Sequence, residues 1–486
     1  MRTHDKLFIG GEWVEPAGEQ TIEVISPATE EVIGRVPDST VTDVDRAVAA
    51  ARKAFDSGPW PWMSAEERAQ RMARLGELMK ARMEEFARLI SEEVGSPISW
   101  SSMAQAFAPT MILDYYTNLA RTYPFEELRQ GVLGPAVVRA EPVGVVGAIV
   151  PWNVPLFVTM AKLSPALAAG CTVVLKPAPE TPLDAFLLAE LIQEAGIPEG
   201  VVNVVPAGRE VGERVVTHPA VDKISFTGST AAGKRIASLC GESLKRCTLE
   251  LGGKSAAIVL EDAPLEEIVG SLLDSAMMNN GEACVAQTRI LAPQSRYQEV
   301  VDSLCERVES LVVGDPLDPA TQIGPLVAER QRARVESYIK AGQEEGAKVA
   351  VGGGRPKGLE RGWYVEPTVF VDVDNKMRIA QEEIFGPVVS VIPYRDEQEA
   401  VAIANDSTYG LSGTVWTADP DRGLEVARRV RTGTYTINGF TLDFATPFGG
   451  FKQSGIGREF GPEGLELFLE KKSVGLPAGY TPPGLG

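Results

Sequence analysis

The middle of the chain alternates short apolar runs with stretches of helical character. The apolar runs lie at 143–150 (VGVVGAIV), 172–177 (TVVLKP), 201–207 (VVNVVPA) and 223–228 (KISFTG), and helix-like stretches lie between and after them at 156–169, 183–195 and 230–239. Strands that alternate with helices of this length build a parallel sheet wound on both faces. The sequence therefore predicts an α/β fold with a doubly wound parallel sheet.

Polar segments follow three of these predicted strands. They are Pro151-Trp152-Asn153, Lys176-Pro177-Ala178 and Thr227-Gly228-Ser229. Ligands of open parallel sheets bind at the carboxyl ends of the strands. We expect the three segments to converge on one crevice.

The flanking regions contain further elements. Short strands are predicted within residues 7–36, with a turn at Gly10-Gly11. One helix places Val44, Val48, Ala51 and Phe55 on a single face. A single helix is predicted from about 65 to 94, ending at Gly95-Ser96-Pro97, and another covers roughly 103–121. Residues 122–142 have alternating, strand-like character.

The segment FTGSTAAGKR (226–235) comes within one residue of a P-loop. That motif needs Ser or Thr after its lysine to hold magnesium, and this chain has Arg235 there. A nucleotide hydrolase is therefore the less favoured interpretation. Exposed backbone N–H groups at a helix start would still hold the pyrophosphate of a dinucleotide. A tight turn with close helix packing needs the same glycines, so the segment alone leaves both interpretations open.

Composition excludes several classes of partner. The 486 residues suffice for two or three domains, and a net charge of −19 argues against nucleic acid or an anionic membrane surface. No apolar run is long enough to cross a bilayer, and the first residues, MRTHDKLFIGGEW, lack the apolar core of a signal peptide. Five scattered cysteines suit free thiols in a reducing cytoplasm, and no CxxC pair predicts a metal site.

Four further segments carry distinctive motifs. They are CTLELGGKS (247–255), NNGEACVAQTRI (279–290), EEIFGPV (382–388) and PFGGFKQSGIGRE (447–459). Together with PWN, LKP and FTGST, and in this order, they resemble the aldehyde dehydrogenase superfamily of NAD(P)-dependent enzymes. The resemblance covers nearly the whole chain. No magnesium site is built in this family, which would explain why Arg235 is allowed.

The resemblance implies a catalytic set. A thiolate that attacks an aldehyde gives a tetrahedral alkoxide, which expels hydride readily. Cys284, in a polar glycine-containing loop, matches the nucleophile; Cys171, Cys240, Cys247 and Cys305 suit structural roles better. The amide of Asn153 and the N–H of Cys284 match the oxyanion donors, and Glu250 matches the base that activates water for thioester hydrolysis.

Without the resemblance, these residues read differently. Asn153 is better explained as a turn residue, and Glu250 would be a solvated turn glutamate. Lys162 matches a lysine assigned to proton relay in part of the family, although a helical lysine usually faces solvent.

The resemblance also implies a cofactor site for NAD. Glu383 matches the acid that grips the nicotinamide ribose, and Phe385 would lie near the nicotinamide. The remaining implied contacts are Ile149, Val150, Pro151, Trp152, Lys176, Gly208, Gly212, Phe226, Thr227, Gly228, Ser229, Gly233, Leu251 and Gly252. One position departs from the pattern: Pro179 stands where NAD-preferring members often carry Glu, and Glu180 comes one residue later. NAD is favoured, with NADP or dual use as the alternative.

The implied substrate tunnel is mostly apolar. Its residues lie near Val154, Ala161, Ala283, Val285, Asp443, Phe444 and Phe448. A hydrophobic aldehyde is therefore the expected substrate, and no basic residue in this set points to a carboxylated or phosphorylated one.

The family fold implies the domain organisation. Residues 1–121 and 143–252 would form a Rossmann-like NAD(P)-binding domain, 253–440 a second α/β catalytic domain, and 441–470 a return to the first. Residues 122–142 and 471–486 would form a small β oligomerisation hairpin and tail, with a strand near 471–478 pairing to a neighbouring subunit of a homodimer or homotetramer. The rivals are a CoA-acylating semialdehyde dehydrogenase, disfavoured by Glu250, and a non-enzymatic structural protein, disfavoured by the intact Cys284, Glu250 and Asn153.

Overall fold

The computed structural model describes residues 2–477, 479, 480 and 482. The alternating middle of the chain forms the core of an eight-stranded sheet, ordered β20-β12-β11-β8-β9-β10-β2-β3. Its parallel strands are β8 (Val145–Ile149), β9 (Thr172–Lys176), β10 (Val202–Val204), β11 (Lys223–Thr227) and β12 (Arg246–Glu250). The antiparallel additions at the two edges are β2 (Leu7–Ile9), β3 (Glu12–Val14) and β20 (Gly455–Ile456).

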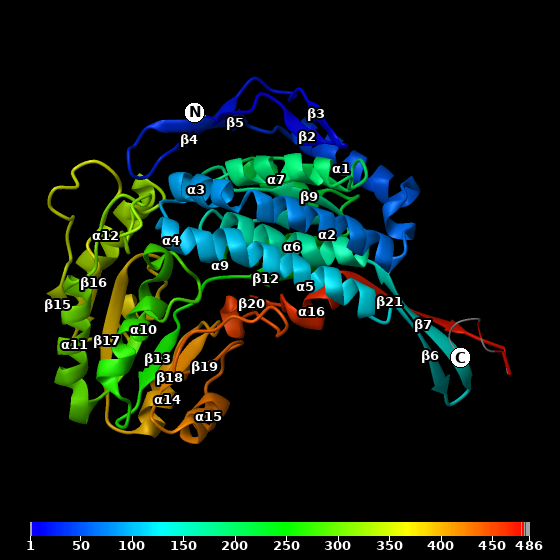
Figure 1. The fold of residues 1–486 in the computed structure, drawn as a ribbon. Helices are drawn as coiled ribbons and strands as arrows, with labels where there is room; N and C mark the ends of the chain where they lie inside the picture. The colour runs from blue at the N-terminus through cyan, green and yellow to red at the C-terminus, as the bar shows by residue number, and fades with distance from the viewer. Residues whose placement is uncertain (1, 478, 481, 483–486) are drawn as a thin grey trace.

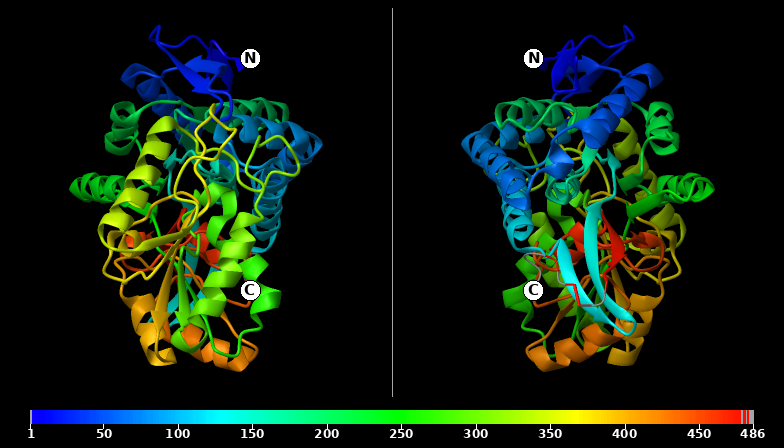
Figure 2. Two further views of the ribbon diagram at one scale, coloured as in Figure 1. Left: turned by 90° about the vertical axis from the view of Figure 1, so that its left-hand side faces the viewer. Right: turned by 90° about the vertical axis from the view of Figure 1, so that its right-hand side faces the viewer.

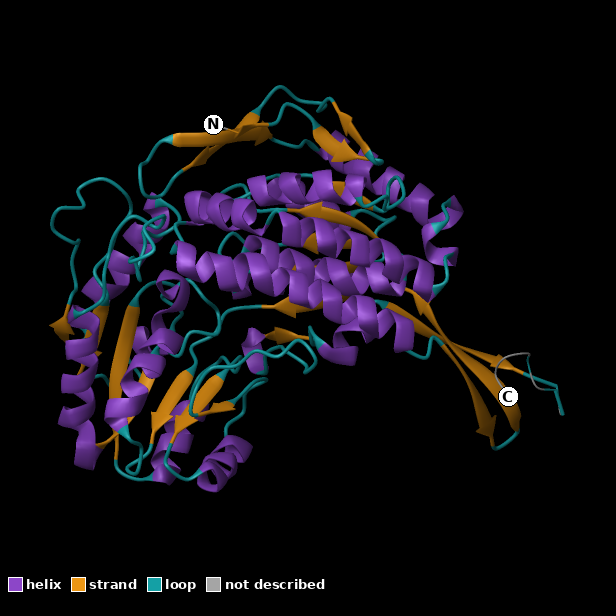
Figure 3. Cartoon of the chain, in the orientation of Figure 1, coloured by secondary structure: helices purple, strands orange, loops and turns teal. Residues whose placement is uncertain are grey.

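Helices cover this sheet in layers (Figures 1 and 3). The crossovers use α6 (Pro155–Ala169), α7 (Leu183–Glu194), α8 (Arg209–Thr217) and α9 (Thr230–Glu242). Strand order reverses after β10, so right-handed crossovers place α6 and α7 on one face and α8 and α9 on the other. The helices α1 (Val41–Ser57), α2 (Ala65–Ala81) and α5 (Ala108–Thr122) pack around these, with α2 and α5 against α6.

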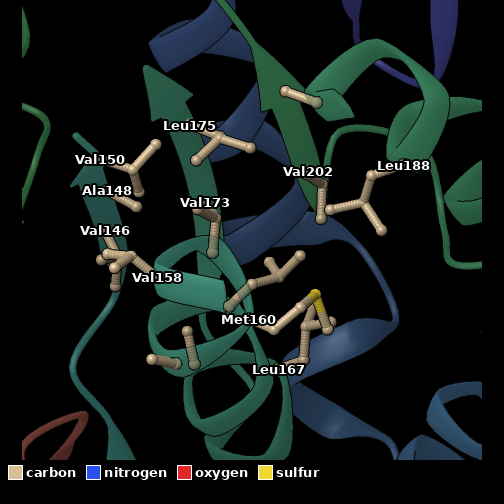
Figure 4. Close-up of a cluster of buried hydrophobic side chains, with 14 of the residues drawn as sticks. Val146, Ala148, Val150, Val158, Met160, Leu167, Val173, Leu175, Leu188 and Val202 are labelled. Carbon is tan, nitrogen blue, oxygen red and sulfur yellow. The ribbon is translucent and has the colours of Figure 1, made fainter. Parts of the chain in front are cut away.

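The core between β8, β9, β10 and α6 is almost entirely aliphatic (Figure 4). Val146, Val173 and Val202 of the strands lie near Met160 and Leu167 of α6, and each is at most 1% exposed. Strands buried on both faces read as continuous apolar runs, because neither face of the sheet meets water. This packing fixes the strand ends that carry the predicted crevice.

A second sheet of seven strands follows in the order β15-β16-β17-β14-β13-β18-β19. Its members are β13 (Ala256–Val259), β14 (Arg289–Pro293), β15 (Lys348–Val351), β16 (Thr368–Val371), β17 (Val388–Tyr394), β18 (Gly413–Trp416) and β19 (Thr436–Ile437). The helices of this region are α10 (Leu265–Met277), α11 (Tyr297–Glu309), α12 (Glu329–Glu344), α13 (Arg378–Gln381), α14 (Glu397–Asn405) and α15 (Pro420–Arg429). All of its pairings are parallel except β15 with β16.

A three-stranded sheet projects from the body of the molecule (Figures 1 and 2). It contains β6 (Glu126–Gly131), β7 (Gly134–Pro142) and β21 (Leu469–Gly475), ordered β21-β7-β6. The tail strand thus pairs with the hairpin of its own chain, which the sequence did not predict. Residues 478, 481 and 483–486 of the predicted tail lie outside the described residues.

Smaller elements complete the chain. Near the N-terminus, β1 (Arg2–Thr3), β5 (Val32–Pro37) and β4 (Thr21–Ile25) form another sheet. Short helical turns are η1 (Trp60–Trp62), α4 (Ile98–Trp100), η3 (Met278–Gly281), η4 (Gln294–Arg296), η5 (Lys452–Ser454) and α16 (Gly461–Glu466). Over the part of the chain that the structure describes, no helix has the length and apolar character needed to span a membrane.

Two helix predictions were wrong in detail. The predicted helix 65–94 is two helices, α2 and α3 (Met83–Val94), because Arg82 leaves the helical conformation at φ −115°. Its N–H bonds the Met79 carbonyl three residues back, and its guanidinium binds Glu85 and Glu190. The predicted helix 103–121 begins as a wide π-helix, η2 (Ser101–Phe107), before α5.

Candidate active site

Cys284 lies in a loop that three consecutive left-handed residues form. Asn279, Asn280 and Gly281 have φ angles of +52°, +60° and +74°. A β-carbon at residue 281 would collide with the Gly386 carbonyl, so this position requires glycine. The loop brings the Cys284 side chain to a cavity of about 390 Å³ that Asn153, Glu383 and Phe385 also line.

The Cys284 thiol lies in an environment that opposes its ionisation. Burial raises its pKa above the usual value for a thiol, and the carboxyl groups of Glu383 and Glu250 add to the increase. Glu383 lines the same cavity as Cys284, whereas Glu250 is not among the residues that line it. A thiol of this kind needs an added positive charge or a base before it can attack a substrate.

Asn153 stands opposite the Cys284 loop and is 5% exposed. It follows β8, and its side-chain Nδ2 donates to the Glu282 carbonyl at 2.8 Å. Its own carbonyl accepts from Gln105 Nε2 at 3.2 Å and from Asn279 Nδ2 at 2.9 Å. The side-chain amide therefore has a fixed orientation beside Cys284.

Glu250 ends β12 and is 3% exposed. Neither carboxylate oxygen has a hydrogen-bond partner among the described residues. Burial raises the pKa of Glu250 well above its usual value and Glu459 raises it further, while Lys162 and Arg458 oppose the shift. An unpartnered, buried carboxyl with a raised pKa suits a general base that works near neutral pH.

Lys162 points inward from α6 and does not face solvent. Its Nζ lies 2.5 Å from Glu459 Oε1, and both side chains are buried. Glu459 was missed as a site residue, although it ends the segment PFGGFKQSGIGRE that marked the resemblance. Lys162, Glu459 and Glu250 thus form one group of buried charges.

A second cavity of about 470 Å³ lies at the carboxyl ends of β8, β9 and β11. It shares Pro151, Trp152, Thr227, Gly228 and Ser229 with the Cys284 cavity. The three polar segments predicted from the sequence therefore converge as expected, and the two cavities make one elongated cradle. Thr227 lines it, and its buried Oγ1 has no hydrogen-bond partner within the described ranges.

The cradle contains most of the predicted cofactor residues. Its lining includes Ile149, Val150, Pro151, Trp152, Lys176, Gly212, Phe226, Thr227, Gly228, Ser229, Leu251, Gly252, Glu383 and Phe385. Gly208 and Gly233 line neither cavity. A β-carbon at residue 233 would lie 2.5 Å from the Leu251 side chain, so Gly233 lets α9 approach this strand end closely.

Charged groups surround the end of this cradle that lies at β9. Lys176 Nζ donates to the carbonyls of Pro177 and Ala207, and burial lowers its pKa to about 8. Glu180 pairs with Arg330, whose side chain lines both cavities beside Arg209. The two arginines were not predicted, because no motif of the sequence contains them.

Aromatic side chains cluster around Phe460. Phe444 lies 6.0 Å from Phe157 and 5.3 Å from Phe460, and Phe448 lies 5.9 Å from Phe460, measured between ring centroids. Phe157, in the first turn of α6, and Phe460 were not predicted. Val154 lines the Cys284 cavity, Ala283 is half-buried, and Ala161 and Val285 are buried; Asp443 is exposed and caps a turn at Ala445.

Comparisons with known proteins identify the family of the chain. The sequence model of the aldehyde dehydrogenase family matches residues 13–474. Geranial dehydrogenase of Castellaniella defragrans is 49% identical, over 97% of this chain and 99% of the relative. The crystal structure of Mycobacterium tuberculosis aldehyde dehydrogenase complexed with NAD⁺ has a TM-score of 0.98 at 53% identity, covering 99% of each chain.

A further match is the structure of an aldehyde dehydrogenase C mutant from Pseudomonas syringae, complexed with NAD⁺ and octanal. It has a TM-score of 0.94 at 44% identity, with 97% of this chain and 96% of that chain covered. The chain belongs to the aldehyde dehydrogenase family. The predicted fold class and the predicted class of enzyme, an oxidoreductase acting on the aldehyde group, are confirmed.

Proposed function

We propose that this protein oxidises a hydrophobic aldehyde to the carboxylic acid with NAD⁺. The observation that carries the proposal is the meeting of Cys284, Asn153 and Glu383 around one cavity, with the Glu250 carboxyl close enough to affect the thiol. The matched structures with bound NAD⁺, one of which also holds octanal, support the cofactor and an apolar substrate. The aromatic cluster around Phe444 supports the same substrate class.

The cradle fits a dinucleotide. It runs along the carboxyl ends of parallel strands and includes the start of α9, where free N–H groups favour a phosphate. Thr227 Oγ1 offers an unused polar group, and Glu383 would accept from ribose hydroxyls. Bound NAD⁺ supplies the hydride acceptor and a positive charge that opposes the raised pKa of the thiol.

The side chains of this chain then have distinct tasks. The Cys284 thiolate adds to the aldehyde carbon, and the carbonyl oxygen becomes an oxyanion that Asn153 Nδ2 and the Cys284 N–H stabilise. Loss of hydride leaves an acyl thioester on Cys284. Glu250 takes a proton from water, the resulting hydroxide attacks the thioester carbon, and the C–S bond breaks to release the acid and the thiolate.

The assembly and domain boundaries are part of this proposal. We assign 1–121 and 143–252 to the cofactor domain, 253–440 to the catalytic domain, and 441–470 to a return segment. The projecting hairpin and the second edge of β21, which makes no sheet pairing among the described residues, support a homodimer or homotetramer. Five free cysteines support a cytoplasmic location. Sedimentation equilibrium on the full chain would give the subunit number.

The direct test is the formation of NADH and NADPH from a panel of short, long, aromatic and terpenoid aldehydes, with and without CoA. We expect turnover with NAD⁺ and a long apolar aldehyde, no requirement for CoA, and none of this turnover in Cys284→Ala. Folded protein that binds NAD⁺ but oxidises none of the aldehydes would refute the proposal.

A further inference from the structure

Asn279 lies at the centre of a buried polar network that joins the Cys284 loop to Asn153. The network contains Ser96, Gln105, Asn153, Asn279 and Glu282, and each is at most 5% exposed. These residues come from four separate parts of the chain: the turn after α3, the π-helix η2, the end of β8, and the loop of Cys284. Buried polar networks that are well bonded hold their members in one arrangement.

The Asn279 side chain makes contacts in three directions. Its Nδ2 donates to the Asn153 carbonyl at 2.9 Å and to the Glu282 carbonyl at 3.2 Å, while Oδ1 accepts from Ser96 Oγ. The Glu282 carbonyl also accepts from Asn153 Nδ2 at 2.8 Å. Hydrogen bonds therefore join Asn279, Asn153 and Glu282 pairwise in a closed triangle. Glu282 stands two residues before Cys284.

Gln105 reinforces this triangle from the π-helix. Its Nε2 donates to the Asn153 carbonyl at 3.2 Å and to Ser96 Oγ at 3.1 Å. The Asn153 carbonyl thus accepts from two side-chain amides. The backbone and the side chain of Asn153 are both held, and Asn279 takes part in each restraint.

We propose that Asn279 is a positioning residue for aldehyde oxidation, which aligns the Asn153 amide with the Cys284 N–H. The inference rests on the proposed function, in which these two donors stabilise the oxyanion. The backbone of Asn279 is left-handed, which Asn and Asp tolerate better than other side chains. Asparagine alone combines that backbone with an amide able to bond both carbonyls and Ser96.

The chain provides a matched control in the next residue. Asn280 has φ +60° and is 0% exposed. Its Nδ2 donates to the carbonyls of Gly95 and Pro325, both at 3.0 Å, and its Oδ1 accepts from the Gly324 N–H at 2.6 Å. None of these bonds involves Asn153 or Glu282, so Asn280 anchors the loop without aligning the donors.

The experiment compares Asn279→Asp with Asn280→Asp. Both changes keep the side-chain size and the left-handed backbone but replace the amide donor by oxygen. We expect Asn279→Asp to lower kcat about 10- to 100-fold, because a small misplacement of an aligned group has effects of this order. In Asn279→Asp the KM for the aldehyde and the Kd for NAD⁺ should stay within about threefold of the wild-type values. Asn280→Asp should lower Tm, while its kcat should stay within about threefold of the wild-type value.

A double-mutant cycle separates positioning from general damage. If Asn279 acts through Asn153, then Asn153→Ala combined with Asn279→Asp should be no slower than Asn153→Ala alone, within about threefold. Three results would each overturn the inference. They are a wild-type kcat in Asn279→Asp, an equal loss of kcat in Asn280→Asp, and losses of kcat that multiply in the double variant. If circular dichroism shows that Asn279→Asp is unfolded, Ser96→Ala replaces it as the test variant. A loss of kcat in Ser96→Ala that disappears when Asn153→Ala is also present supports the inference. Wild-type kcat in Ser96→Ala overturns it. Failure of the proposed function would be visible separately, as wild-type protein without aldehyde turnover.

Discussion

Lys162 Nζ and Glu459 Oε1 form a buried ion pair of 2.5 Å, and both groups act on the carboxyl of Glu250. Lys162 favours the ionised form of Glu250, whereas Glu459 disfavours it. Burial is the largest cause of the raised pKa of Glu250, and the effects of Glu459 and Lys162 have opposite signs. Lys162 therefore opposes the rise in the pKa of Glu250 but does not cancel it.

Replacing Lys162 by Met should shift the pH dependence of turnover. Without the ammonium, only Arg458 opposes the repulsion by Glu459, so the pKa of Glu250 rises further. A base acts only when ionised, so the acid limb of the kcat profile should move to higher pH, with the rate reduced at pH 7 and recovering at alkaline pH. The free energy of unfolding should also fall by about 3–5 kcal/mol, the typical effect of removing one partner of a buried ion pair. Profiles from pH 5 to 9 check this, with the exposed Lys80→Met as control; an unmoved acid limb would contradict it.

Glu250→Gln should separate the two halves of the reaction. The amide cannot take a proton from water, so thioester hydrolysis should slow about 10²- to 10⁴-fold. Acylation of Cys284 should remain, and stopped-flow absorbance should show a burst of NADH of about one equivalent per active site. Loss of the burst together with steady turnover would mean that Glu250 is needed before the thioester forms. The exposed Glu242→Gln serves as the control.

Pro179→Glu should strengthen the preference for NAD over NADP. Pro179 lines the end of the cradle at β9, as Lys176 does, and the adjacent Glu180 is already paired with Arg330. A carboxylate at position 179 would repel a 2′-phosphate and accept from a 2′-hydroxyl. We expect kcat/KM for NADP to fall about tenfold or more, with a much smaller change for NAD. Pro179→Gln has the same length without the charge, and an equal effect in that variant would argue against repulsion.

Phe444→Ala should lower activity selectively toward long apolar aldehydes. Phe444 contacts Phe157 and Phe460, and its removal takes apolar surface from the proposed tunnel. Burial of an aromatic side chain is worth about 1.5–3 kcal/mol, so kcat/KM for octanal should fall about 10- to 100-fold relative to propanal. Steady-state kinetics with both aldehydes check this. Trp62→Ala, at an exposed position, should leave the ratio unchanged.

Asp184→Asn should raise stability at neutral and alkaline pH but not at acid pH. Asp184 and Glu93 are buried neighbours; burial raises the pKa of Asp184 to about 7, and burial together with Asp184 raises that of Glu93. A raised folded-state pKa gives a contribution that is complete below the unfolded pKa and is lost as the pH rises through about 7. At about 1.4 kcal/mol per unit, the loss at pH 8 is at most about 4 kcal/mol. Thermal melts should show a higher Tm for the variant at pH 8 and no change at pH 4; an equal decrease at both values would contradict this.

Much of the fold could be predicted because its signals are local. The apolar runs that became β8, β9, β10 and β11 are continuous in sequence, and Cys284 and Glu250 lie within short segments that mark the family. Arg82 was different, since one partner of its guanidinium is Glu190, which lies more than one hundred residues away and which no local pattern indicates. Glu459 was missed for a similar reason, because its contact with Lys162 joins residues 297 apart.

Unusual backbone conformations also could not be predicted from the sequence. Asn279 and Asn280 are quoted in a predicted motif, yet nothing in the letters shows that both are left-handed and buried. The same holds for Gln105, which a regular helix would place differently from the wide turn of η2. These features arise when separate chain segments pack together, so a single sequence does not reveal them.

The edge strand β20 sets the order in which the active site can be completed during synthesis. Gly455 and Ile456 pair with Glu250 and Leu249, and the Leu251 N–H donates to the Ser454 carbonyl. A nascent chain that ends before residue 454 already contains Cys284, Asn153 and Glu250, but the end of β12 lacks these partners. The carboxyl end of β12 therefore reaches its final environment only when nearly the whole chain has been synthesised, and a product that stops before residue 454 would lack the backbone bonds that hold Glu250 and Leu251.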